Sequence, residues 1–411
     1  MDDLRAAIAP FDADAPLTAA PDPWDYLPMP AVRPGPPWAM AEMIAAEPAL
    51  VGRIVERVLT DGTADALAAA LRRAAEAREP VVVTGCGTSE HAAMGAAAIL
   101  RDAWRGADLA GWGPIAAQAF ELAQEPPSSG LVIGVSHEGA TTATIAALEA
   151  ARAAGAGTAL LTGSAGSPAT TSADTVLATV EMDRSWCHTV GYVSPMAAAY
   201  ATATLLAGEI PDAGALSARV TAGIEASWSS GSVATPAATM GHAIAEAAHL
   251  LVIGSGVDRV TARELTLKVE EASYVPSAMR DLETFLHGHL PATGESTALV
   301  LVLTERASLH ARAARARQAL AAAAATGIRA GAILGAEASA RIPEALTPAG
   351  RIVIAESPGL APAVASLFGA AAPLQLVTLA AAEAKGTNPD AIRRDDPVYL
   401  RAAELADDPS V

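Results

Sequence analysis

The sequence predicts an α/β protein with two three-layer α/β/α domains, each built on a parallel sheet flanked by helices. Short β-type runs such as PVVVTG and GLVIGV alternate with alanine-rich helical segments through most of the 411 residues. Strands that alternate with helices pair in parallel, with helices on both faces of the sheet. Gly85 and Gly87 recur as Gly254 and Gly256, so we expect two copies of one unit.

The expected elements follow in a simple order. Good helix formers with helical spacing predict two helices between residues 38 and 78. In the first unit we expect helices at 89–104 and 140–154 and strands in the runs 80–85, 130–135, 157–163 and 174–180. In the second unit we expect a long helix at 308–326 and strands in the runs 249–256, 298–305, 330–335 and 351–357.

The composition also predicts how the chain divides into segments. An arm rich in Pro, Asp and Ala is expected to be irregular and to lie on the body or on a partner subunit. The expected segments are this arm at 1–37, a first domain at 38–210, a connection at 211–245, a second domain at 246–372, and a C-terminal helix and tail at 373–411.

The composition also excludes several function classes. The net charge of −18 disfavours binding to nucleic acid or to an anionic membrane. Cys86 and Cys187 are the only cysteines, and they lack the spacing of a metal site. No run of about 20 strongly apolar residues is present, and no secretory leader pattern opens the chain. We therefore expect a cytoplasmic protein without a membrane segment or a cofactor.

Two glycine-containing stretches, TGCGTSEH and VSHEGATT, each join a predicted strand to a predicted helix. Strand ends in an open parallel sheet face a crevice, and helix N-termini direct free N–H groups into it. The hydroxyls of Thr88, Ser89, Ser136 and Thr141 add donors. We expect the two turns together to hold a phosphate or a similar oxyanion. The alternative is that these small residues only form tight turns and cap helices.

The second unit carries titratable residues instead. Glu264, Lys268 and Glu271 are spaced to share one face of a helix. The simplest interpretation is an exposed ion pair, but beside a crevice the same groups can shuttle a proton. His287 and His289 lack a third ligand at a recognised spacing, so we expect titrating groups there and no zinc site.

With these motifs in order, the chain resembles the sugar isomerase (SIS) domain proteins, in the tandem form of the isomerase half of glucosamine-6-phosphate synthase. The resemblance runs through MAEMIAAEP, both glycine turns, LKVEEASY, HGH and PLQL…KGTNPD, and it covers most of residues 40–396. It implies a sugar phosphate as the small-molecule partner and a homodimer with shared active sites.

The resemblance assigns roles residue by residue. It places the sugar phosphate at Gly87, Thr88, Ser89, Ser136, His137, Glu138, Thr141 and Ser194. It makes Glu271 the base that moves a proton between C1 and C2 through an enediol, with Lys268 one helical turn before it. It assigns His287 to opening of the sugar ring, reaching across from a second subunit.

The chain also departs from the family pattern. The family's N-terminal glutaminase domain is not found, and Pro397 stands where the family has its ring-opening lysine. Thr189 and Met196 replace a glutamate and a lysine, and His137 and Glu138 replace a glutamine and a serine. A carboxylate within about 5 Å of a phosphate is repulsive by a kcal/mol or more unless it points away or pairs with a cation, and a protonated His137 would offset it.

We therefore expect an enzyme acting on a phosphorylated ketose or amino sugar. The reaction is either an aldose–ketose isomerisation or the deamination or deglycation of a ketosamine phosphate, through an enediol or enolamine. The alternative is a regulatory module of the same fold that binds a sugar phosphate without turnover. The presence of both Glu271 and His287 favours the enzyme.

Overall fold

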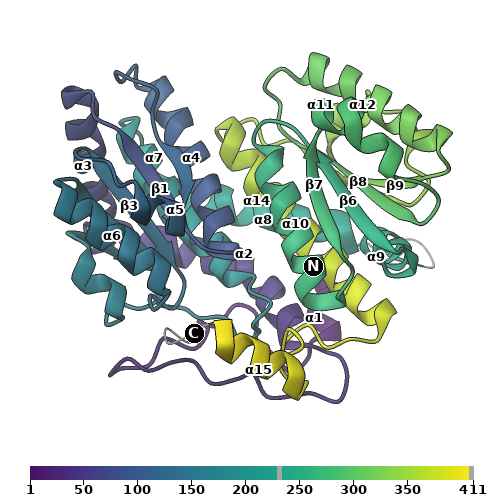
Figure 1. The fold of residues 1–411 in the computed structure, drawn as a ribbon, viewed down its shortest axis with the longest axis horizontal. Helices are drawn as coiled ribbons and strands as arrows, with labels where there is room; N and C mark the ends of the chain where they lie inside the picture. The colour runs from purple at the N-terminus through teal and green to yellow at the C-terminus, as the bar shows by residue number, and fades with distance from the viewer. Residues whose placement is uncertain (229–233, 407–411) are drawn as a thin grey trace.

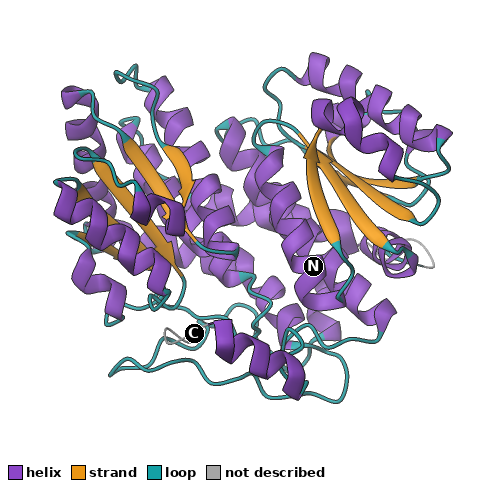
Figure 2. Ribbon diagram, in the orientation of Figure 1, coloured by secondary structure: helices purple, strands orange, loops and turns teal. Residues whose placement is uncertain are grey.

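The computed structural model describes residues 1–228 and 234–406, and it consists of two α/β halves that lie side by side (Figure 1). Each half contains a five-stranded parallel sheet with helices against both faces (Figure 2). This arrangement confirms the predicted fold class. Parts of the expected connection and tail, residues 229–233 and 407–411, lie outside the described residues.

The first sheet has the strand order β2-β1-β3-β4-β5. Its strands are β1 (Val81–Gly85), β2 (Ile115–Gln118), β3 (Leu131–Ser136), β4 (Gly157–Thr162) and β5 (Thr175–Ala178). Strands β1 and β3 are parallel neighbours, with Val82 opposite Val132. The two predicted anion turns, which follow these strands, therefore open at the same edge of the sheet.

The second sheet has the order β10-β9-β8-β6-β7. Its strands are β6 (His249–Gly254), β7 (Ser277–Asp281), β8 (Thr297–Leu303), β9 (Arg329–Gly335) and β10 (Arg351–Ile354). Read from β7, this order is the order of the first sheet, which confirms the predicted repeat. The edge strands β2 and β7 were not predicted from the sequence.

The described residues form three hydrophobic cores. One face of the first sheet packs against α5 (Ala119–Gln124) and α6 (Thr142–Ala154), and one face of the second packs against α12 (Leu309–Ala325). The remaining faces of both sheets share one continuous core. Helices in it are α2 (Ala39–Thr60), α3 (Thr63–Ala77), α4 (Thr88–Gly106), α7 (Val190–Leu206), α8 (Ala213–Trp228), α9 (Pro236–Glu246), α10 (Asp258–Ser273) and α14 (Pro362–Lys385). Side chains of the two halves can therefore meet in one site.

Helix α14 lies at the centre of the molecule. It starts with Pro362 and ends at Gly386, a left-handed C-cap with φ 72°. A boundary at residue 373 thus falls inside this helix, and the expected connection at 211–245 contains α8 and α9. The 24 residues of α14 are long and apolar enough to cross a membrane, but the apolar window is 100% buried in the fold. Burial in the core accounts for a helix that is apolar all round.

Residues 14–27 of the N-terminal arm contact the first half. The arm begins with a short helix, α1 (Asp2–Ala7), and Ala19 forms a bridge with Glu181 beyond β5. The Glu181 carboxylate accepts the Leu17 N–H at 2.7 Å and pairs with Arg53 of α2 at 2.7 Å. Another helix, α15 (Pro397–Ala406), stands where only a polar tail was expected. Figure 1 shows the arm and α15 together below the two halves.

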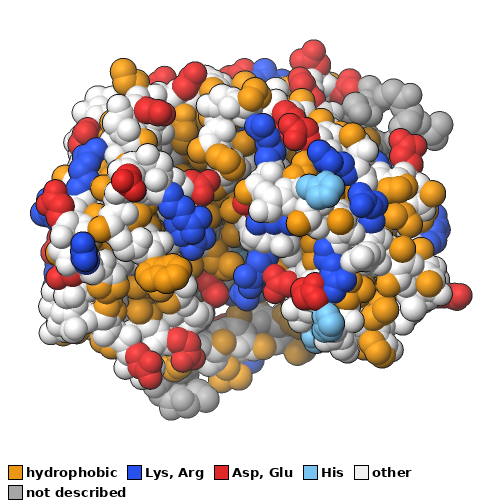
Figure 3. All heavy atoms as spheres, turned by 90° about the horizontal axis from the view of Figure 1, so that it is seen from above, with side chains coloured by type: hydrophobic (Ala, Val, Ile, Leu, Met, Phe, Trp, Pro, Cys, Tyr) orange, Lys and Arg blue, Asp and Glu red, His pale blue; other side chains and the backbone are white. Residues whose placement is uncertain are grey.

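The surface is mixed in charge on the face seen from above. Basic side chains there are interspersed with acidic and hydrophobic ones (Figure 3). With a net charge of −18, a bound anion has to be held by local donors because the protein as a whole repels it.

Candidate active site

The turn between β1 and α4 is shaped by glycine. Gly87 has φ 57° and ψ −129°, a conformation that other residues rarely adopt. A Cβ on Gly85 would lie 2.6 Å from the Ser89 carbonyl oxygen and 2.9 Å from that of Val135. These glycines allow α4 to begin directly at Thr88, so its first N–H groups face the end of the sheet.

The turn between β3 and α6 supplies hydroxyl groups. Gly139 has φ 71°, again a glycine conformation. Ser136 Oγ donates to Thr141 Oγ1 at 3.3 Å. Thr141 is the N-cap of α6, yet its side chain accepts no hydrogen bond from the helix backbone. The Thr141 hydroxyl and the first N–H groups of α6 are therefore free to bind an anion.

A cavity of about 770 Å³ lies at the two turns. The predicted site residues that line it are Thr88, Ser89, His137, Glu138, Thr141 and Glu271. Glu271 comes from α10 in the second half, whereas the others come from the first half. The fold thus brings the predicted anion turns and the predicted base into one cavity.

Other predicted residues lie outside the lining. Gly87 and Ser136 belong to the turns themselves. Ser194 is 0% exposed in α7, and its hydroxyl has no hydrogen-bond partner among the described residues. The His287 side chain is 70% exposed and forms an ion pair with Glu283 at 2.7 Å. Within one chain, Ser194 and His287 therefore do not reach the cavity.

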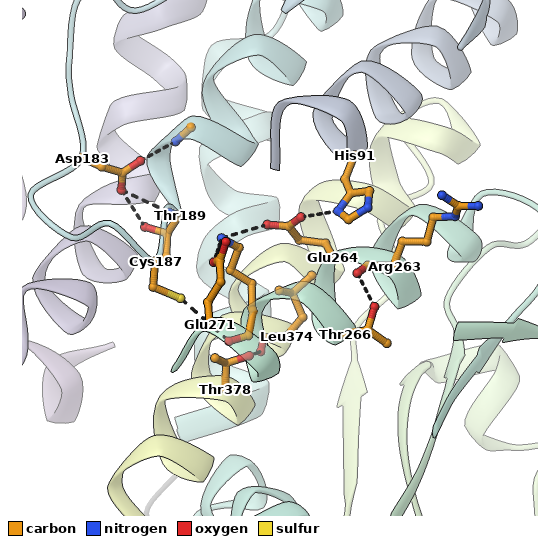
Figure 4. Close-up of polar contacts among 12 residues, drawn as sticks. His91, Asp183, Cys187, Thr189, Arg263, Glu264, Thr266, Glu271, Leu374 and Thr378 are labelled. Atoms are coloured by element: carbon orange, nitrogen blue, oxygen red, sulfur yellow. Dashed lines mark hydrogen bonds and ion pairs between the residues drawn. The ribbon is translucent and has the colours of Figure 1, made fainter. Parts of the chain in front are cut away.

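Lys268 forms ion pairs with Glu271 and with Glu264. Its Nζ lies 2.5 Å from a Glu271 oxygen and 3.7 Å from a Glu264 oxygen, and its side chain is 0% exposed. His91 of α4 donates through Nδ1 to Glu264 at 2.7 Å, which joins the two halves (Figure 4). Because Lys268 is fully buried, the interpretation of these residues as an exposed ion pair is wrong.

This cluster sets the protonation states of both groups. Burial raises the pKa of Glu271, against the opposing effect of the Lys268 ammonium. Burial alone would lower the pKa of Lys268, but the Glu271 and Glu264 carboxylates outweigh it and raise that pKa. Lys268 therefore stays charged, and Glu271 is a stronger base than an ordinary carboxylate.

His137 does not carry the compensating charge that the sequence suggested. Its Nε2 accepts the Asp183 N–H at 3.1 Å, which requires a lone pair on that nitrogen. Burial also lowers the pKa of His137. His137 is therefore neutral, although its Nε2 also lies 3.4 Å from the Asp183 carboxylate.

The charge of Glu138 is accommodated in another way. Its carboxylate accepts the backbone N–H of Leu27 in the arm, and Trp24 Nε1 donates to its carbonyl oxygen at 3.2 Å. Burial raises the pKa of Glu138, while the Leu27 bond and the Arg394 guanidinium oppose this. The side chain is thus directed toward the arm and has a cation near it, which reduces its repulsion of a bound anion.

Sequence reasoning missed the residues that close the cavity on its other sides. They are Tyr26 and Leu27 from the arm, Trp186 and His188 between β5 and α7, and Ile392 and Arg394 near the C-terminus. The Arg394 guanidinium lies 5.1 Å from the centre of the Trp186 ring, within the range of a cation–π contact.

The family model of the SIS domain matches residues 75–207 and 243–331, more than half of the chain. The chain belongs to the SIS domain family. The first matched segment contains both anion turns, and the second contains Glu271. No curated protein sequence matches the chain.

Solved SIS-type structures share the fold. The C-terminal domain of glucosamine-fructose-6-phosphate aminotransferase from Francisella tularensis is 19% identical, with a TM-score of 0.70 over 88% of this chain and 99% of that one. Tagatose-6-phosphate ketose/aldose isomerase from Escherichia coli is 20% identical, with a TM-score of 0.67 over 88% and 97%. Glucosamine-6-phosphate deaminase from Thermotoga maritima is 17% identical, with a TM-score of 0.57 over 76% and 87%.

In the second SIS domain, the carboxylates of Asp258 and Glu305 occupy the turns that follow β6 and β8. Asp258, at the start of α10, is 0% exposed and accepts the Thr304 hydroxyl at 2.6 Å, the Ser366 hydroxyl at 3.0 Å and the Glu305 N–H at 3.2 Å. Glu305 in turn pairs with Arg312. The hydroxyls of Thr304 and Ser366 and the Glu305 N–H are therefore already bonded to an internal carboxylate.

Proposed function

We propose that this SIS-family protein is an enzyme of the sugar-phosphate isomerase type, which moves a proton between neighbouring carbons of a phosphorylated ketose or amino sugar. The observation that carries the proposal is the cavity in which the anion turns of the first domain face Glu271 of the second. An anion site and a carbon base in one cavity match a substrate with a phosphate at one end and a carbonyl at the other.

The proposed mechanism follows from these positions. The N-termini of α4 and α6, with the hydroxyls of Thr88, Ser89 and Thr141, hold the phosphate. Glu271 takes a proton from the carbon beside the carbonyl and returns it to the neighbouring carbon through an enediol. Lys268 fixes the orientation of the Glu271 carboxylate. An amino-sugar phosphate follows the same path through an enolamine to an imine, and addition of water to the imine carbon then releases the amine and leaves a carbonyl.

The structural neighbours support the substrate class. Their names refer to fructose-6-phosphate, tagatose-6-phosphate and glucosamine-6-phosphate. We accordingly propose a six-carbon sugar 6-phosphate, with isomerisation, deamination and deglycation as the reactions to be distinguished.

We further propose that the protein is a cytoplasmic homodimer. A cytoplasmic location is consistent with two free thiols, Cys86 and Cys187. The largely exposed His287 is accessible to a second copy, as the family resemblance implies. Light scattering that gives a clean monomer at micromolar concentration contradicts a shared site.

The test uses fructose 6-phosphate, tagatose 6-phosphate, glucosamine 6-phosphate and inorganic phosphate as probes. Thermal shift identifies binding, since a ligand at 100 times its Kd adds about 2.7 kcal/mol of stability. Proton NMR in deuterated water then follows loss of the C1 and C2 hydrogen signals, and an ammonia assay follows deamination. Exchange or ammonia release supports the proposal. Binding of the sugar phosphates without either reaction contradicts it and indicates a regulatory module.

A further inference from the structure

His188 shares the cavity wall with Glu271. It immediately precedes Thr189, the N-cap of α7, so the start of that helix determines its position. The Asp183 carboxylate accepts the N–H groups of Thr189 at 3.1 Å, Val190 at 3.1 Å and Gly191 at 2.7 Å. These bonds fix the backbone that carries His188.

The His188 ring is held by packing and leaves its nitrogens free. It contacts the His137 ring edge to face, with centroids 5.1 Å apart. His137 is itself fixed by the Asp183 N–H, which leaves it no lone pair for a ligand. In the described part of the chain neither ring nitrogen of His188 has a hydrogen-bond partner, so both are available to a molecule in the cavity.

Burial keeps this imidazole neutral. Burial lowers the pKa of His188 to about 3. The Asp183 carboxylate opposes that shift, while His137, Lys268 and Arg394 add to it. A neutral imidazole has one N–H donor and one lone pair, so it can give a proton to one oxygen and take one from another.

The histidine assigned by the family resemblance is placed differently. His287 lies on the surface, where its Nε2 is 2.7 Å from Glu283 and 3.4 Å from Arg315. His188 needs no second chain, because it already faces the same cavity as the base.

We propose that His188 is a second catalytic residue, which carries a proton between the carbonyl oxygen and the neighbouring hydroxyl oxygen while Glu271 carries the proton between the two carbons. This inference rests on the proposed function. It assigns the oxygen-to-oxygen transfer to a residue of the same chain.

The proton transfers balance for a ketose. Glu271 takes a C1 proton, the C1–H electron pair forms the C1–C2 double bond, and the carbonyl π pair moves to O2, which takes the His188 N–H proton. This leaves an imidazolate, which takes the O1–H proton and becomes neutral imidazole again as the C1 carbonyl forms, while C2 takes the proton back from Glu271. Both side chains end in their starting states.

The test compares His188→Gln with wild type on whichever probe shows C1 or C2 exchange. Gln keeps a donor but cannot both give and take a proton, so kcat should fall by roughly 10² to 10⁴ while KM stays within about twofold. His310→Gln, a change at an exposed position of α12, is the matched control and should keep wild-type kinetics. His188→Asn is the second variant if the first is poorly folded.

Two readouts separate catalysis from a structural role. The thermal shift caused by inorganic phosphate should be the same in wild type and His188→Gln. Activity of His188→Gln within threefold of wild type overturns the inference, and so does loss of activity together with loss of the phosphate shift. His287→Gln is assayed alongside; a fall confined to that variant assigns the role to the surface histidine instead. Absence of exchange in wild type is a different result, because it removes the proposed function itself.

Discussion

Replacing Glu271 by Gln should stop proton transfer while leaving the substrate bound. Gln has the size of Glu and an oxygen that can still accept from Lys268, but it lacks a basic carboxylate. Because general base catalysis contributes about 10² to 10⁴ in rate, kcat should fall by that factor with little change in binding.

The loss of folding stability caused by Glu271→Gln should be moderate. Removing one partner of a buried ion pair costs about 3–5 kcal/mol when the remaining charge is left alone. Here the buried Lys268 ammonium keeps Glu264 at 3.7 Å and the new amide oxygen beside it. We therefore expect about 1–3 kcal/mol, the range for a hydrogen bond to a charged group. Thermal unfolding should show a fall of a few degrees, and the fold should persist.

The assay is hydrogen exchange at C1 and C2 of the sugar in deuterated water, with Glu270→Gln as the matched control. Glu270 is the neighbouring residue of α10, is exposed, and accepts the Ser277 N–H at 2.9 Å. The same chemical change at that position should leave the exchange rate as in wild type. Equal exchange rates in wild type and Glu271→Gln would refute the role of Glu271 as base.

Other predictions test the turns and the core. Ser136→Ala removes the hydroxyl beside Thr141 and should weaken phosphate binding by about 1–2 kcal/mol in titration calorimetry; an unchanged Kd contradicts the site. Calorimetry should also give one phosphate per chain, because Asp258 and Glu305 occupy the second turn; two sites contradict this. Burial raises the pKa of Glu47 well above 4.5, so the folded chain keeps a proton that the unfolded chain releases, and stability falls as pH rises above about 4.5. The gain in Tm for Glu47→Gln should therefore grow from about pH 5.5 to 8.5, and a gain that stays constant contradicts the reasoning.

The sequence predicts best those strands that are fully buried, because their residues form continuous apolar runs. Strands β1, β3 and β8 are buried along their whole length and read as continuous apolar runs. The edge strands β2 and β7, with the sequences IAAQ and SAMRD, have no fully buried residue. Because neither strand contains a buried apolar run, hydrophobic patterning did not reveal them.

The site was predictable only where its chemistry is local. The Gly87 backbone, at φ 57° and ψ −129°, favours glycine, and a Cβ on Gly139 would lie 1.9 Å from Ser167 Oγ. The hydroxyls that follow are a few residues away in the same turn. His188 and Arg394 reach the cavity through tertiary packing, and no spacing in the sequence connects them to those turns. The family resemblance also suggested Ser194 as a phosphate ligand, but this residue is buried in α7.

The corresponding turns of the two SIS domains differ in whether an internal carboxylate accepts their hydrogen bonds. In the second copy, Asp258 accepts the Thr304 N–H at 3.0 Å and also bonds to the hydroxyls of Thr304 and Ser366. These donors are therefore satisfied without a ligand. In the first copy, the Thr141 hydroxyl accepts no hydrogen bond from the backbone of α6, and α6 has no acidic residue in its first turn. Leaving such donors unpaired sacrifices stability that an internal carboxylate would supply, as expected where function opposes stability. We therefore propose that a ligand binds at the turn of the first copy, with Glu271 across the cavity, and that the carboxylate-bonded turn of the second copy stabilises the fold.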